Sequence, residues 1–164
     1  MIPAKLKSAA LRVRGSGWAG GYLNPALLPT AERIETLNAA GQPLQIEPGD
    51  LMAVLLLADI RQADLMGSAG AARGTRMPGL RVKVRTLDHY GLEGILATNL
   101  LELDRGLWLD PLYSGSIWQR AFFPRSAVEQ LQAVEMTKAP RRRPNGRSVQ
   151  QFGLFETSQE EEGT

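Results

Sequence analysis

The chain has 164 residues, enough for one ordinary domain or two very small ones, and its 43% hydrophobic content suffices to build a core. It has no cysteine and one histidine, His89, which excludes disulfides, thiolate metal sites, a cysteine nucleophile and paired-histidine sites within one chain. Nineteen Lys and Arg residues against seventeen Asp and Glu give a net charge of +2, so the chain carries no strong positive field.

Neither terminus nor interior suggests a membrane protein. Lysines in the first ten residues are followed by arginines instead of an apolar segment, so no signal peptide is recognisable. The most apolar run, residues 51–60, is about half as long as a membrane-spanning helix. We therefore expect a soluble, cytoplasmic protein.

Composition divides the chain into four segments. Two of them, residues 7–60 and 80–136, are rich in short apolar patterns, and each is expected to form a small β unit. Residues 61–79, rich in Ala, Gly and Arg, are expected to connect the two units. Residues 137–164, basic and then acidic with several prolines, are expected to form a disordered tail.

In the first unit, apolar runs between turn residues predict five short strands, at residues 11–14, 20–23, 33–37, 43–47 and 51–58. A competing interpretation makes residues 31–40 a helix capped by Thr30, because they include good helix formers. We favour the strand, since helical spacing would leave only Ile34 and Leu37 as apolar anchors.

The second unit repeats this layout. Its predicted strands are residues 80–87, 92–98, 106–110, 117–123 and 131–136. Gly94 predicts a bulge or a close approach of neighbouring backbone, and Ser126 is expected to cap a helical turn over residues 127–130.

Pro48 in the first unit and Pro124 in the second each follow a predicted hairpin and precede a short turn and an apolar strand. We interpret this as a cryptic duplication, the alternative being two unrelated β-meanders. Five short strands with one helical turn before the last are typical of small SH3-like or Sm-like barrels. The predicted fold is therefore mainly β, with two such barrel units in tandem.

The segments 92–101, 106–109 and 119–128, together with Gly21-Tyr-Leu-Asn-Pro25, resemble a bacterial family of unknown function familiar from acidobacteria. The resemblance covers about residues 10–136, and residues 68–72 of the connection depart from it. It implies a shared fold and no known activity. These motifs have a structural character, because their glycines and prolines suit turns.

No motif in the two units predicts catalysis, so we expect no enzyme, metal or cofactor. His89 lies between Asp88 and Tyr90 in a predicted turn, where neighbouring side chains do not face one another, and we expect an exposed histidine. No cation-binding loop frames the carboxylates Glu102, Asp104 and Asp110. No phosphate-loop sequence follows the closely spaced glycines, which we interpret as turn residues: Gly15, Gly17, Gly20 and Gly21.

A basic strand face gives the alternative function. Arg81, Lys83 and Arg85 alternate on one side of a predicted strand, as in a nucleic-acid-binding module of the Sm-like kind. Aromatic residues available for stacking are Trp108, Tyr113 and Trp118. Against this, residues 1–137 hold fourteen Lys and Arg and thirteen Asp and Glu, a net charge of only +1, and an ordinary solvated strand face explains the pattern equally. A cyclic-dinucleotide receptor of the PilZ kind, suggested by the arginines at 141–143, lacks the motif that should follow them.

The tail carries the most specific motif. Gln151-Phe-Gly-Leu-Phe155 resembles the peptide by which bacterial polymerases and repair proteins bind the DNA sliding clamp. The resemblance makes Gln151 the polar anchor and Leu154 and Phe155 the pocket-filling residues, whereas Phe152 replaces the more usual leucine. The alternatives are that these apolar residues pack on the protein's own units or on a symmetry mate, or bind another partner. We expect a non-enzymatic adaptor whose tail recruits a protein partner.

Overall fold

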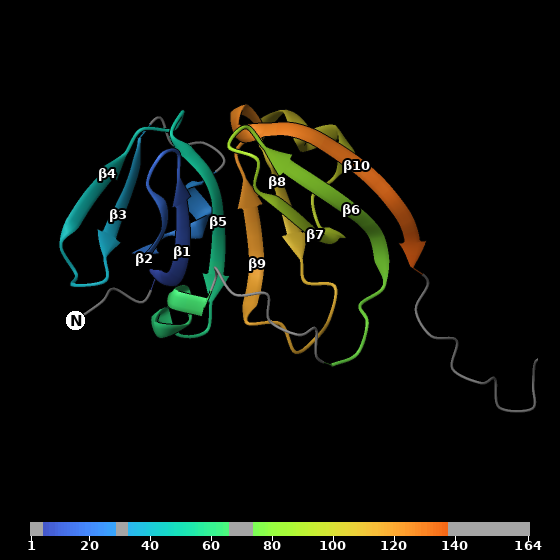
Figure 1. Cartoon of the computed structure of the whole chain (residues 1–164), viewed down its shortest axis with the longest axis horizontal. Coiled ribbons are helices and arrows are strands. Elements are labelled where there is room, and N and C mark those ends of the chain that lie inside the picture. The colour runs from blue at the N-terminus through green and yellow to red at the C-terminus, as the bar shows by residue number, and fades with distance from the viewer. Residues whose placement is uncertain (1–4, 29–32, 66–73, 138–164) are drawn as a thin grey trace, which may run out of the picture.

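The computed structural model describes residues 5–28, 33–65 and 74–137, which form a mainly β fold (Figure 1). Its ten strands belong to one antiparallel sheet, and the same part of the chain holds four short 3-10 helices. The N-terminal half consists of β1 (Lys7–Val13), β2 (Gly17–Leu23), η1 (Pro25–Leu27), β3 (Ile34–Asn38), β4 (Pro43–Ile46) and β5 (Leu51–Leu57). The remainder consists of η2 (Ile60–Leu65), β6 (Gly79–Thr86), β7 (Gly91–Leu96), η3 (Leu100–Arg105), β8 (Leu107–Asp110), β9 (Trp118–Phe123), η4 (Arg125–Ala127) and β10 (Val128–Thr137).

The mainly β class is confirmed, and each predicted strand overlaps an observed one. The helical interpretation of residues 31–40 is wrong over its described part, because Ile34–Asn38 pairs with β4. The predicted helical turn is also misplaced. It spans Arg125–Ala127 without a side-chain cap from Ser126, and Val128 already has the extended conformation that begins β10.

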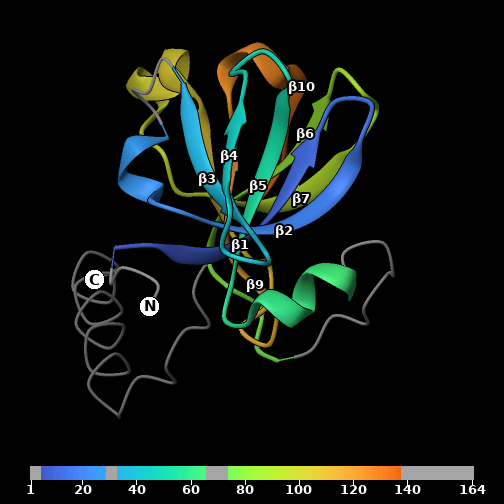
Figure 2. The ribbon, with the colours of Figure 1, turned by 90° about the vertical axis from the view of Figure 1, so that its left-hand side faces the viewer.

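The predicted connection begins with ordered structure. Residues Ile60–Leu65 form η2, which continues from the end of β5 in both views (Figures 1 and 2). Ala63 of η2 is buried, and both Ala63 and Ile60 lie against Gly20 of β2. The small side chain of Ala63 and the missing side chain of Gly20 therefore allow η2 to pack closely on the sheet.

The order of strands across the sheet is β4-β3-β2-β1-β5-β9-β8-β7-β6-β10. Each half contributes five adjacent strands, arranged so that its fifth strand lies beside its first. The halves join where β5 pairs with β9, through Val54 opposite Phe122 and Leu55 opposite Ala121. The predicted closure into two barrels is not confirmed, because the described strands form one open sheet with β4 and β10 at its edges.

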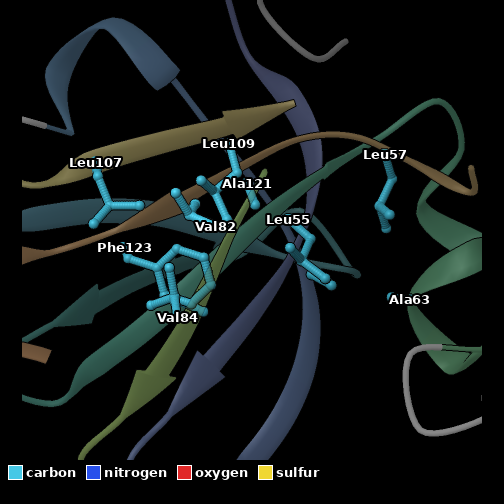
Figure 3. Close-up of a cluster of buried hydrophobic side chains, with 11 residues drawn as sticks. Leu55, Leu57, Ala63, Val82, Val84, Leu107, Leu109, Ala121 and Phe123 are labelled. Atoms are coloured by element: carbon cyan, nitrogen blue, oxygen red, sulfur yellow. The ribbon is translucent and has the colours of Figure 1, made fainter. Parts of the chain in front are cut away.

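Strand β5 and the last three residues of β9, Ala121 to Phe123, are buried on both faces. Successive side chains of a strand point to opposite faces, so Phe122 and Phe123 enter different hydrophobic clusters. Leu55 and Leu57 belong to the same buried cluster as Val82, Val84 and Phe123, which we call the C-terminal core (Figure 3). Its buried members are Ala10, Ala53, Leu55, Leu57, Ala63, Val82, Val84, Leu107, Leu109, Ala121 and Phe123. The N-terminal core consists of Ala9, Leu11, Leu23, Leu28, Ile34, Ile46, Leu51, Val54 and Phe122. The continuous apolar sequence of β5 therefore serves two cores.

A glycine in the second strand of each half permits a close crossing. A Cβ atom on Gly21 of β2 would lie 2.7 Å from the carbonyl oxygen of Leu37, and one on Gly94 of β7 would lie 2.8 Å from that of Asp110. In both halves the second strand pairs with the third over only two residues. The expected close approach at Gly94 is therefore confirmed, and Gly21 occupies the corresponding place in the N-terminal half.

This geometry predicts different effects for two glycines of β7. Replacing Gly94 with Ala should lower the free energy of unfolding by about 1–3 kcal/mol, because the added methyl group meets backbone that cannot move away cheaply. Gly91→Ala is the matched control, since its Cβ would meet nothing closer than the Val84 carbonyl oxygen at 3.8 Å. Urea unfolding measures both, and equal stability of the two variants would contradict the close crossing.

Candidate functional site

The predicted basic face lies on β6, on the side opposite the buried Val82 and Val84. Carboxylates of the neighbouring strands hold two of its three cations. Arg81 donates hydrogen bonds to Glu93 of β7 and to Glu135 of β10, and Nε of Arg85 donates to Glu129 of β10 at 2.9 Å.

Lys83 is the third cation of this face, and it is exposed. The described residues show no ion pair to it. The proposed stacking residues Trp108 and Trp118 are half-buried against the two cores, and Trp108 packs on Phe122 with ring centroids 4.9 Å apart. The face therefore has largely balanced charge, and Lys83 is its cation without an ion pair among the described residues.

The structure assembles a cluster that the sequence did not indicate. Arg12 of β1 reaches across the junction between the halves, and its Nε lies 2.8 Å from Oδ2 of Asp88 in the turn after β6. The Arg12 guanidinium lies 5.6 Å from the ring centroid of Trp18 and 5.0 Å from that of Tyr90, and these two rings meet edge to face. We call Arg12, Trp18, Asp88 and Tyr90 the arginine clamp.

Burial and pairing set the protonation of the arginine clamp. Burial by itself would raise the pKa of Asp88, but a hydrogen bond from the buried Thr86 hydroxyl and the charge of Arg12 outweigh it, so the pKa lies below its ordinary value. Burial raises the pKa of Tyr90 to about 12, although the charge of Arg12 opposes the shift.

At neutral pH the Asp88 carboxylate is therefore charged and already bonded, and the Tyr90 phenol keeps its proton. Neither group is suited to accept or deliver a proton near pH 7, because efficient general acid–base groups have pKa values close to the working pH. The Arg12–Asp88 ion pair and the edge-to-face contact of Trp18 with Tyr90 instead fix the β6–β7 turn against β1 and β2. The arginine clamp is thus a structural connection between the two halves.

The other candidates from the sequence lie apart from the arginine clamp or beside it without joining it. His89 is exposed as expected, in a left-handed conformation with φ of 66°. Asp110 accepts a hydrogen bond from Arg120, whereas Glu102 and Asp104 are exposed on η3. Across the described ranges, no group of three or more His, Cys, Asp or Glu residues is arranged to hold a metal ion.

The glycine interpretation needs one correction. Gly15 lies in the turn between β1 and β2, and Gly17 opens β2; both have positive φ. Gly20 and Gly21 are not turn residues but lie within β2, where their missing side chains admit η2 and the β3 backbone.

The predicted partner-binding residues Gln151, Phe152, Leu154 and Phe155 lie outside the described residues, as does the rest of the chain after Thr137. In the part that is described, no helix is long and apolar enough to cross a membrane.

A shallow, largely apolar hollow of about 170 Å³ lies beside η1, lined by Leu23, Asn24, Leu27, Leu28, Arg33, Ile34 and Glu35. Its volume is below that of a typical pocket for a drug-sized ligand.

The arginine clamp predicts a coupling across the junction. Arg12→Ala and Asp88→Ala should each destabilise the protein by about 1–3 kcal/mol, and a double-mutant cycle should give a coupling of about 0.5–3 kcal/mol. The exposed pair Arg61 and Asp59 is the control, with no measurable coupling expected. Additive effects of the two changes at positions 12 and 88 would contradict the arginine clamp.

The same pair predicts a pH dependence. The lowered pKa of Asp88 stabilises the folded state above the ordinary Asp pKa of about 4, and this contribution disappears as pH falls through the lowered value. The stability difference between the native sequence and Asp88→Asn should therefore be constant near neutrality and shrink below about pH 4. Urea unfolding at a series of pH values measures this difference, and an unchanged difference at acid pH would contradict it.

Residues 7–135 match a family described as a family of unknown function, DUF6982. No curated protein and no solved structure shows significant similarity to the chain. The matched range runs from the first residue of β1 into β10, so it includes both halves of the sheet and the arginine clamp between them. The chain therefore belongs to this family of unknown function.

Proposed function

We propose that the protein is a non-enzymatic, cytoplasmic bacterial adaptor that recruits a protein partner through its C-terminal peptide, residues 151–155. The bacterial DNA sliding clamp is the most concrete partner. The observation that carries this proposal is the sequence Gln151-Phe-Gly-Leu-Phe155, which combines one polar anchor with large apolar side chains. Such side chains are costly to expose to water and gain stability when a partner groove buries them.

The position of the C-terminal peptide suits recruitment. Strand β10 ends at Thr137, and the thirteen residues 138–150 separate it from Gln151. Fully extended, thirteen residues span up to about 43 Å at about 3.3 Å each. The peptide can therefore reach a groove on a partner while the β sheet remains outside it.

We further propose that the two halves are SH3-like or Sm-like units in tandem, bounded at residues 7–60 and 80–136. Their shared strand order, the corresponding glycines Gly21 and Gly94 and the separate cores support this organisation. In this arrangement the units form the scaffold and the C-terminal peptide supplies the affinity for the partner.

The charges of the described residues also favour a binding role over an enzymatic one. Arg12, Arg81, Arg85 and Arg120 are each engaged with a carboxylate of another strand or turn. In these ion pairs the charged side chains connect neighbouring strands and turns of the sheet. A reactive centre instead requires titratable groups that converge on space for a substrate.

Binding to purified bacterial sliding clamp tests the proposal. The full chain and a peptide spanning residues 147–156 should both bind with micromolar affinity, measured by calorimetry or fluorescence anisotropy. Leu154→Ala with Phe155→Ala should abolish binding because both pocket-filling side chains are removed, and Gln151→Ala should do so by removing the polar anchor. Ser148→Ala and Phe152→Leu are matched controls that should retain binding.

The outcomes separate the alternatives. If the C-terminal peptide packs on the protein's own sheet, the isolated peptide should bind more tightly than the full chain, because the full chain must first release it. If neither binds the clamp, the partner is wrong. Equal binding by the Leu154→Ala, Phe155→Ala variant would contradict the assigned anchors.

The alternative proposal is an Sm-like nucleic-acid-binding module that uses the basic face of Arg81, Lys83 and Arg85. The exposed Lys83 favours it, whereas the carboxylates beside Arg81 and Arg85 reduce the net positive charge available to phosphates.

Salt titration of single-stranded RNA or DNA binding tests this alternative. Arg81→Ala with Arg85→Ala should weaken binding and flatten its salt dependence, because fewer phosphate contacts release fewer ions. Arg61→Ala, at an exposed position in η2, is the control expected to leave binding unchanged. Binding that is insensitive to the double change would rule out this face.

A further inference from the structure

The junction between the halves leaves the same type of pairing unmade at both ends of the sheet. At the junction, the fifth strand of the N-terminal half, β5, pairs with the fourth strand of the C-terminal half, β9. The edge strands of the described sheet are β4 and β10, which are the fourth strand of the N-terminal half and the fifth of the C-terminal half. Each edge is therefore the counterpart of one member of the β5–β9 pair.

We propose that β10 of one copy pairs antiparallel with β4 of the next, so that the chain assembles with itself head to tail. The partner of each edge is a second copy of this chain, and the contact continues the sheet across molecules as β5–β9 continues it within one. The two edges lie at opposite ends of the sheet (Figure 1), so the pairing joins different copies.

The chemistry of β10 suits such a contact. It is ten residues long, and Leu131, Val134 and Met136 expose 37%, 47% and 65% of their surface. A long edge strand with unpaired backbone groups and exposed apolar side chains is prone to pair with another strand. Its charged residues Glu129 and Glu135 form ion pairs with arginines of their own chain, which lowers the electrostatic cost of approach.

The opposing edge is complementary in character. Strand β4 has the sequence Pro43-Leu-Gln-Ile46, with no charged residue, and Leu44 exposes 44% of its surface. Pairing would place Leu44 against β10 and bury part of its side chain. Neither edge carries a lysine. The features of these strands that oppose association are Pro43 in the short β4 and two register irregularities in β10.

The intramolecular junction also predicts a register. Placing Pro48 on Pro124 relates the halves by 76 positions, since 124 minus 48 is 76. The observed pair Leu56 and Arg120 then corresponds to Gln132 of one copy opposite Leu44 of the next. A contact between two different surfaces forms a ring when the rotation between copies closes and a filament when it does not. Either assembly is consistent with the proposed pairing.

Disulfide trapping in the full chain tests the register. The protein has no cysteine, so any disulfide comes from the introduced residues. Gln132→Cys combined with Leu44→Cys should give a ladder of covalent multimers on oxidation, because opposite residues of antiparallel strands have Cα atoms about 4.5–5.5 Å apart, within disulfide range. Asp104→Cys combined with Leu44→Cys is the matched control, since exposed Asp104 lies on η3 and not on an edge strand, and it should not give a ladder.

Solution mass gives a second measurement. Light scattering should show the unmodified chain as a multiple of its monomer mass. Val134→Lys with Met136→Lys should return the protein to the monomer, because the two lysines add positive charge to the edge strand. Circular dichroism should show an unchanged fold, because the side chains of Val134 and Met136 are exposed. Leu101→Lys, at a leucine of η3 that exposes 88% of its surface and is not part of an edge strand, should leave the assembly intact.

Three results would overturn the proposal. They are a monomer at every concentration measured, a ladder from the control pair as strong as from the designed pair, and crosslinking by Gln132→Cys alone, which would indicate β10 pairing with β10. None of these measurements uses the DNA sliding clamp or depends on what the C-terminal peptide binds. Failure here is therefore distinguishable from failure of the proposed function.

Discussion

The pairing of β5 with β9 is the interaction on which the rest of the structure depends. Because β5 is apolar throughout, an edge position or a single covered face would leave several large side chains in water. Its central place in the sheet, with one core on each face, buries nearly all of them. The same pairing brings the β6–β7 turn near β1, where Arg12 meets Asp88 and the two halves become one unit.

Much of the fold was predictable from local pattern, and its long-range arrangement was not. Alternation at Leu80–Thr86 and the continuous apolar run Leu51–Leu57 indicate strands, and Pro48 and Pro124 mark the turns before the last strand of each half. Nothing local specifies that β5 pairs with β9, since an apolar strand accepts many neighbours. The Arg12–Asp88 pair spans 76 positions, and the turn around Asp88 gave no signal of a distant cation.

The charged residues of the described sheet stabilise it through ion pairs, whereas the predicted partner-binding residues lie in the C-terminal peptide. On β6, β7 and β10, acidic and basic side chains pair across strands, which makes this face well hydrated but nearly neutral. The partner-binding prediction for Gln151, Phe152, Leu154 and Phe155 rests on residue types alone, because these positions lie beyond the described range. The binding prediction for the C-terminal peptide therefore comes from the sequence, whereas the structure explains how the strands of the sheet are held together.

The double burial of β5 has a consequence for synthesis on the ribosome. When β5 emerges, its partner β9 is still 61 positions away, counted from Leu57 to Trp118. At about 5–20 residues per second, the interval is roughly 3–12 s. During that time the side of β5 that later meets β9 and the C-terminal core has no native cover. The nascent N-terminal half is therefore prone to aggregate during this interval. Chaperone binding should be strongest before β9 has been synthesised.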